Sequence, residues 1–286
     1  MSPKIRIIVL MGLVYAPLVL LISGGLPIGA HPEIELQIRE ISARMEHDPD
    51  DPALFLRRGE LHRIHQDWTA AEVDFLSARD LDPDLAVVDF HLGRMKLEAG
   101  EPAAAILALN RFLATRPDQS AALFVWARAR VGLGQNLEAV RDFTRGLAST
   151  PRPLPTYYLE RARALTAAGD KFIGTALRGL DEGLDRLGRP VTLELEAIEL
   201  ELRRGTFDLA LVRVERLAQD SPRREAWLIR RGEILERAGK APQARQAYAQ
   251  ALEAIDTLPP SRRWNRAVQR LQIQAQTALE RLSEER

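Results

Sequence analysis

The stretch from Gly59 to Pro83, GELHRIHQDWTAAEVDFLSARDLDP, contains the pattern from which most of the chain is built. It has a small residue at the start, two alanines followed by an aromatic residue in the middle, and a proline at the end. Prolines recur 34 residues apart at Pro49, Pro83, Pro117 and Pro151. Such a fixed interval indicates an array of structural repeats.

Other columns keep the same interval and contain small or apolar side chains. They are Gly59, Gly93 and Ala127; Ala71, Ala105 and Ala139; Phe75, Leu109 and Phe143; and the turn glycines Gly100 and Gly134. Within one unit, apolar residues at helical spacing predict a first helix within 52–67 and a second within 69–81. Each hairpin would leave an apolar face exposed, so neighbouring hairpins must stack to bury it.

This unit resembles the tetratricopeptide repeat, whose period is 34 residues. It departs from the family where His62, Lys96 and Arg130 replace the usual first-helix aromatic residue, and where Gly146 replaces an alanine. Looser copies continue to Ala251. The resemblance implies an all-α fold, a right-handed α-solenoid of about six helix-turn-helix repeats with a capping helix at each end.

The predicted array occupies residues 52–258, and amphipathic segments flank it. Residues 31–51 form the expected N-terminal capping helix. Residues 259–286 form the expected C-terminal capping helix, with Ser261 as its N-cap. Its apolar stripe consists of Trp264, Val268, Leu271, Ala275, Leu279 and Leu282. The alternative is that this last helix serves dimerisation or binds a membrane surface.

Residues 1–30 have the three-part form of a signal peptide. Lys4 and Arg6 precede a charge-free run over 7–22, and a small, turn-prone segment ends at Ala30. The alternative is an uncleaved membrane anchor, although Pro17 interrupts the apolar run. Both interpretations place the rest of the chain outside the cytoplasm, either periplasmic or secreted, or membrane-anchored and facing away from the cytoplasm.

Composition argues against several function classes. The 40 basic and 40 acidic side chains balance, which disfavours a general nucleic-acid binder. The chain has no cysteine, and the segment 132–137, GLGQNL, lacks the third glycine of a phosphate loop. His62 and His65 have a metal-compatible spacing, and cleavage would make His31 a terminal copper ligand. We expect packing rather than metal binding, no cofactor and no catalytic residue.

In the resembled family the first helices line a concave groove that binds a peptide or partner helix. The repeat phase places one charged row there: Glu60, Arg94, Arg128, Arg163, Glu199 and Glu233. The predicted peptide-binding residues are Phe90, Arg94, Phe124, Arg128 and Arg163. Forked guanidinium groups suit an acidic segment, and the rings suit apolar side chains. The alternative is that the arginines pair with Glu98, Glu138 or Glu160 and only solubilise this face.

Three function classes follow from these observations. The first is a non-catalytic, exported scaffold that binds a protein or peptide segment in the groove. The second is an assembly factor anchored in the inner membrane, for example in cytochrome maturation, a role that members of the resembled family also serve. The third is an enzyme or metal carrier.

Overall fold

The computed structural model describes residues 32–219, 221 and 223–284, and these residues form helices and connecting turns without any strand. Six helix hairpins follow one another along the chain. They are α2 (Pro52–Ile64) with α3 (Trp68–Leu81), α4 (Val87–Glu98) with α5 (Pro102–Thr115), α6 (Ser120–Gly132) with α7 (Asn136–Ala148), α8 (Pro155–Ala167) with α9 (Ile173–Leu187), α10 (Val191–Arg204) with α11 (Phe207–Gln219), and α12 (Arg224–Arg237) with α13 (Ala241–Asp256).

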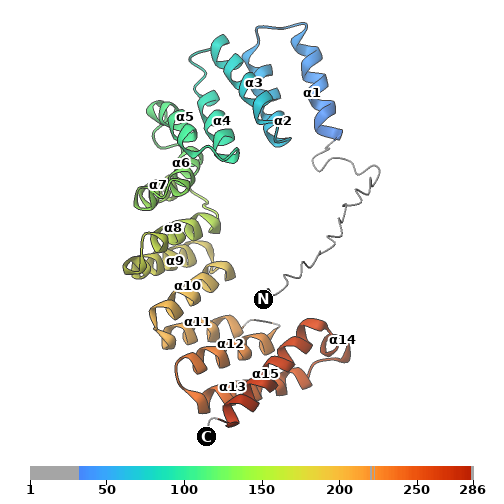
Figure 1. Ribbon diagram of the computed structural model, residues 1–286, viewed down its shortest axis with the longest axis vertical. Helices are drawn as coiled ribbons and strands as arrows, with labels where there is room; N and C mark the ends of the chain where they lie inside the picture. The colour runs from blue at the N-terminus through green and yellow to red at the C-terminus, as the bar shows by residue number, and fades with distance from the viewer. Residues whose placement is uncertain (1–31, 220, 222, 285–286) are drawn as a thin grey trace, which may run out of the picture.

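The hairpins stack in chain order along an open arc (Figure 1). α1 (Pro32–Met45) lies at one end against α2. At the other end α14 (Pro260–Arg263) leads into α15 (Arg266–Glu284), which packs on α13 and α12. A short 3-10 turn, η1 (Asp170–Phe172), precedes α9. The fold is therefore an all-α solenoid, as the repeat pattern predicts.

The small-residue column allows the two helices of a hairpin to approach closely. A Cβ atom added at Gly59 would lie 2.7 Å from Phe75 Cε1, and one added at Gly93 would lie 2.5 Å from Leu109 Cγ. Phe75 and Leu109 are themselves fully buried. The columns seen in the sequence are therefore the two sides of one steric contact, repeated along the array.

The turn between the two helices of a hairpin has the same form in several repeats. Gly100 and Gly134 have φ angles of 81° and 73°. After the first of these, the Glu101 amide donates to the Lys96 carbonyl at 2.8 Å, which closes a helix C-cap of the Schellman type. In the first repeat the same position is Gln66, which adopts φ 62°. A residue with a Cβ thus occupies a left-handed conformation there.

The C-terminal helix differs from its prediction at its start. Ser261 lies inside the short helix α14 and is not the N-cap of α15. Asn265 takes that role, since its side chain accepts from the Ala267 amide at 2.8 Å and its carbonyl accepts from Gln269. The break before α15 also removes Trp264 from the apolar stripe, and its side chain is 73% exposed.

Predictions about the N-terminal segment, the signal peptide or anchor at 1–30 and the copper site at His31, lie outside the described residues. Across the part of the chain that the structure describes, no helix has both the length and the apolar character needed to cross a bilayer.

Candidate functional site

Charged side chains on the first helices form a row across successive repeats, which we call the first-helix row: Glu60, Arg94, Arg128, Arg163, Glu199 and Glu233. All six are partly or fully exposed. Polar contacts join several of the first helices: His91 Nδ1 lies 2.6 Å from Glu60 Oε1, between α4 and α2. The row is therefore a polar surface held together between repeats.

Each predicted arginine of the row has a glutamate partner. Arg94 Nε donates to Glu98 at 3.2 Å on the same helix. Arg128 Nε donates to Glu160 of α8 at 2.9 Å. These two pairs match the alternative in which the arginines pair with neighbouring acids.

Arg163 differs from that alternative, because its partner is Glu196 of α10 at 3.0 Å. Exposed ion pairs of this kind contribute about 0–1 kcal/mol each. They therefore leave the three guanidinium groups available to a competing carboxylate.

The two predicted phenylalanines have different environments. Phe90 is half-buried and lies 5.5 Å from the ring of Phe112. Phe124 is only 3% exposed and packs between the helices of its own repeat and the next. The expectation that the Phe124 ring contacts a ligand is therefore corrected: this side chain belongs to the core, because Gly146 opens space for it there.

Tyr157 is a site residue that the sequence reasoning missed. Its ring stacks on Phe124 with centroids 3.6 Å apart, and Arg128 lies over it at 5.7 Å. Tyr157 remains half-buried. It precedes Glu160 by one helical turn, which is the only sequence signal that could have pointed to it. Tyr157 thus supplies an aromatic surface beside Arg128, and the buried ring of Phe124 stacks against it.

Glu60, at the beginning of the row, is strongly stabilised as a carboxylate. Burial on its own would raise its pKa, but hydrogen bonds from His91 and Arg63 outweigh burial and lower the pKa to about 2. The N-terminal end of the row therefore carries a fixed negative charge that is already engaged in contacts within the protein.

Among the described residues, the histidines pack or pair with carboxylates and do not assemble a metal centre. His62 packs half-buried with Nε2 3.9 Å from Asp74, and His91 engages Glu60. Throughout the described residues, no group of three or more histidine, aspartate and glutamate side chains is arranged to hold a metal ion.

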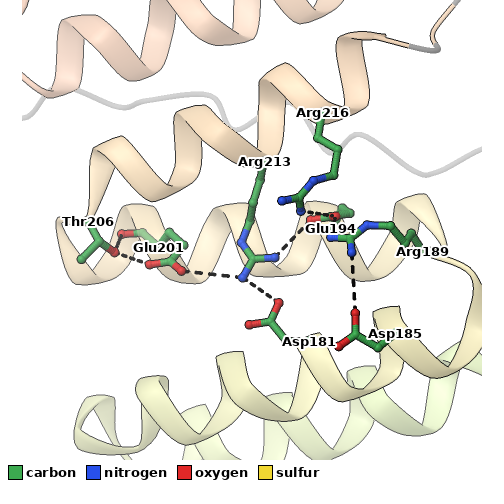
Figure 2. A network of polar contacts seen from close by, with 8 residues as sticks. All are labelled: Asp181, Asp185, Arg189, Glu194, Glu201, Thr206, Arg213 and Arg216. Carbon is green, nitrogen blue, oxygen red and sulfur yellow. Dashed lines mark hydrogen bonds and ion pairs between the residues drawn. The ribbon is translucent and has the colours of Figure 1, made fainter.

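A second polar cluster lies between α9, α10 and α11 (Figure 2). No sequence motif predicted it. Arg213 donates to Glu194 at 3.1 Å and to Asp181 at 2.8 Å. Arg189 and Arg216 also donate to Glu194, at 2.7 and 3.1 Å. The cluster joins the last turns of α9 to the hairpin that follows it.

Comparison with known proteins agrees with this architecture. A family model described as tetratricopeptide repeat matches residues 195–259. A solved tetratricopeptide repeat protein from Parabacteroides merdae is 16% identical, with a TM-score of 0.53 over 86% of this chain and 93% of its own. PilF from Pseudomonas aeruginosa is 13% identical, with a TM-score of 0.50 over 83% and 99%.

MamA from Desulfovibrio magneticus RS-1 is 16% identical, with a TM-score of 0.50 over 54% of this chain and 85% of its own. No curated protein sequence matches the chain. The matched segment covers the hairpins α10–α11 and α12–α13, and four similar hairpins precede them. The family match and these solved structures agree with the described array, which has the all-α solenoid fold of tetratricopeptide repeat proteins.

Proposed function

We propose that this protein is a non-catalytic scaffold that binds a peptide or protein segment along its first-helix row. The observation that carries the proposal is the continuity of that row, with partly or fully exposed ionic side chains on every first helix from α2 to α12. Stacked helical repeats form extended concave surfaces, and such surfaces suit segments that lie across several repeats.

The ligand chemistry follows from the middle of the row. Arg94, Arg128 and Arg163 offer forked donors that suit carboxylates. Phe90 and Tyr157 offer half-buried ring surface beside them. A partly acidic, partly apolar segment fits this combination. Because the row becomes acidic at Glu199 and Glu233, a segment with opposite charges at its two ends would bind in one orientation.

We also propose that the protein acts outside the cytoplasm, either released or anchored. The support is the charge and apolar pattern of residues 1–30. N-terminal sequencing of the protein purified from the native envelope tests this. A chain that starts at His31 indicates cleavage and release, whereas a chain that retains the segment in the membrane fraction indicates an anchor. Recovery of the whole chain from the cytoplasm would contradict both.

The binding proposal is tested with a partner captured by crosslinking pull-down from the native envelope. Replacing Arg94 and Arg128 together by alanine should weaken binding about tenfold, since two charge-assisted contacts are lost. The variant should also respond less to salt, because ions screen exposed charges. The matched control replaces Arg141 and Arg178, exposed arginines on the second helices α7 and α9.

The control variant should bind as the parent does, and all three proteins should melt alike, since exposed charges contribute little to stability. Equal affinity and equal salt response in the Arg94/Arg128 variant and the parent would rule out the first-helix row as the binding surface.

A further inference from the structure

A cavity of about 450 Å³ lies where the fifth and sixth hairpins meet. Its walls come from the turn after α9, the first turns of α10, the end of α11 and the first turn of α12. The lining side chains used below are Arg189, Val191, Glu194, Arg216, Leu217 and Trp227. None of them belongs to the first-helix row.

Glu194 lines this cavity and is bonded to three arginines (Figure 2). It is 1% exposed and accepts from Arg189, Arg213 and Arg216. Burial on its own would raise the pKa of Glu194, but the three guanidinium groups outweigh it and hold the pKa below its ordinary value. Glu194 is therefore ionised.

Arg213, the third arginine of the cluster, also has two carboxylate partners besides Glu194. Arg213 is buried, donates to Asp181 at 2.8 Å and lies 3.8 Å from Glu201. Neither of these carboxylates lines the cavity. The charge of Arg213 is therefore balanced by carboxylates that lie outside the cavity lining.

The other two arginines present guanidinium surface to the cavity. Arg189 and Arg216 have side chains that are 42% and 43% exposed, against 1% for the Glu194 that they share. The second carboxylate near Arg189 is Asp185, 3.6 Å away and 79% exposed. The cavity is thus lined by two partly exposed arginines and the nearly buried Glu194, with Trp227, Val191 and Leu217 as its apolar walls.

We propose that this cavity binds the carboxylate of a peptide, held by Arg189 and Arg216, with a neighbouring apolar side chain against Trp227. Two positive groups that converge on a cavity with one aromatic wall match a planar anion attached to an apolar chain. The carboxylate can come from a chain terminus or from an acidic side chain. The site is independent of the first-helix row, so either can fail without the other.

The test uses the full chain labelled with ¹⁵N and follows the indole N–H signal of Trp227, which is assigned by its loss in Trp227→Phe. Three N-acetylated peptides share one apolar sequence. The first ends in a free carboxylate and has no acidic residue, the second is amidated and contains glutamate, and the third is amidated with glutamine in its place.

Saturable shifts with the first peptide only identify a terminal carboxylate as the ligand, and shifts with the second only identify an acidic side chain. Shifts with both indicate that either source is accepted. Equal shifts with the glutamine peptide, or no shift with either carboxylate peptide, would overturn the proposal.

Two variants should change the affinity in opposite directions. Arg216→Gln removes one donor and should weaken binding about tenfold. Asp185→Asn removes a competitor for Arg189 and should strengthen binding about twofold. The matched control is Arg203→Gln, an exposed arginine of α10 that pairs with Asp170 away from the cavity and should leave affinity unchanged.

Because loss of folding cannot strengthen binding, the Asp185→Asn result stays informative even where Arg216→Gln loosens the hairpin. Unchanged affinity in a folded Arg216→Gln protein, or weaker binding by Asp185→Asn, would exclude this cavity as a carboxylate site.

Discussion

The ring of Phe124 lies against the backbone of Gly146, where a Cβ atom would come within 2.6 Å of Phe124 Cε1. The same ring stacks on Tyr157 of the next repeat. Gly146, which departs from the repeat pattern, thus leaves room for the ring of Phe124. Through this contact the third hairpin supports the aromatic surface beside Arg128.

Gly146→Ala should destabilise the third hairpin by about 1–2 kcal/mol. Overpacking of a filled core costs roughly 1–3 kcal/mol, and the better helix propensity of alanine returns at most about 1 kcal/mol. Denaturant unfolding measures the change. The control is Gly174→Ala on α9, whose added Cβ would have no neighbour closer than 3.8 Å, so its stability should not fall. Equal behaviour of the two variants would contradict the contact.

Gln66→Gly should stabilise the first hairpin by about 1 kcal/mol, although a substitution by glycine usually lowers the stability of the folded state. The reason is the φ angle of 62° at Gln66, a left-handed conformation that costs a residue with a Cβ roughly 1–2 kcal/mol. Gln66→Ala keeps the Cβ and should give no such gain. Hydrogen exchange of the α2 and α3 amides reports the change, and a gain from alanine as large as that from glycine would argue against strain at this turn.

Asp142 should make stability depend on pH in an unusual direction. Its carboxyl is 3% exposed, and Oδ2 has no hydrogen-bond partner although Arg130 Nη1 lies 2.8 Å away. Burial raises its pKa to about 6, above the ordinary 3.8, and outweighs Arg130. The folded state therefore binds this proton more tightly than the unfolded state, and its contribution to stability is lost as pH rises from about 4 to about 6.

Asp142→Asn removes this titration, so its stability relative to the parent should improve by about 1–3 kcal/mol between pH 4 and pH 7. Denaturant unfolding at both pH values measures the difference. Asp74 holds the same position two repeats earlier and accepts two hydrogen bonds from Arg58, so Asp74→Asn should lower stability at pH 7. Parallel pH profiles for the parent and Asp142→Asn would refute the assignment.

Asn265→Ala should loosen the start of α15 and cost about 0.5–2 kcal/mol, the usual value of an N-cap side chain. The Asn265 side chain accepts from the Ala267 amide, and alanine cannot replace that contact. Thermal unfolding followed by circular dichroism measures the loss. Ser261→Ala, one short helix earlier, should leave the melting temperature unchanged. A larger effect at Ser261 than at Asn265 would restore the cap predicted from the sequence.

The hairpins were predictable because their contacts are repeated. Gly59 with Phe75 and Gly93 with Leu109 are the same steric pair, 34 residues apart, and so appear as columns. The environment of Asp142 could not be predicted from the repeat columns. Arg58, which holds Asp74, corresponds to Trp126 in the third repeat, and that substitution leaves Asp142 with Arg130 alone. A repeat column shows that the arginine partner of this aspartate has been replaced, but it does not show which other residue pairs with the aspartate instead.

The candidate sites were predictable only in part, because the residues that contact their side chains come from neighbouring helices and repeats. The row of Arg94, Arg128 and Arg163 follows from the repeat phase, whereas the burial of Phe124 depends on the local space at Gly146. The cavity at Glu194 was missed because its charges come from the turn after α9 and from α10 and α11, in a region where the spacing of the repeats is irregular.

The stacking of hairpins in chain order has a mechanical consequence. The extensive contacts of the array join elements that are close in the chain, so each junction between hairpins can bend with little effect on distant ones. A small rotation at each of five junctions adds up to a large change in the span of the arc. The curvature of the arc is therefore set by many small angles, one at each junction, and not by any single hinge.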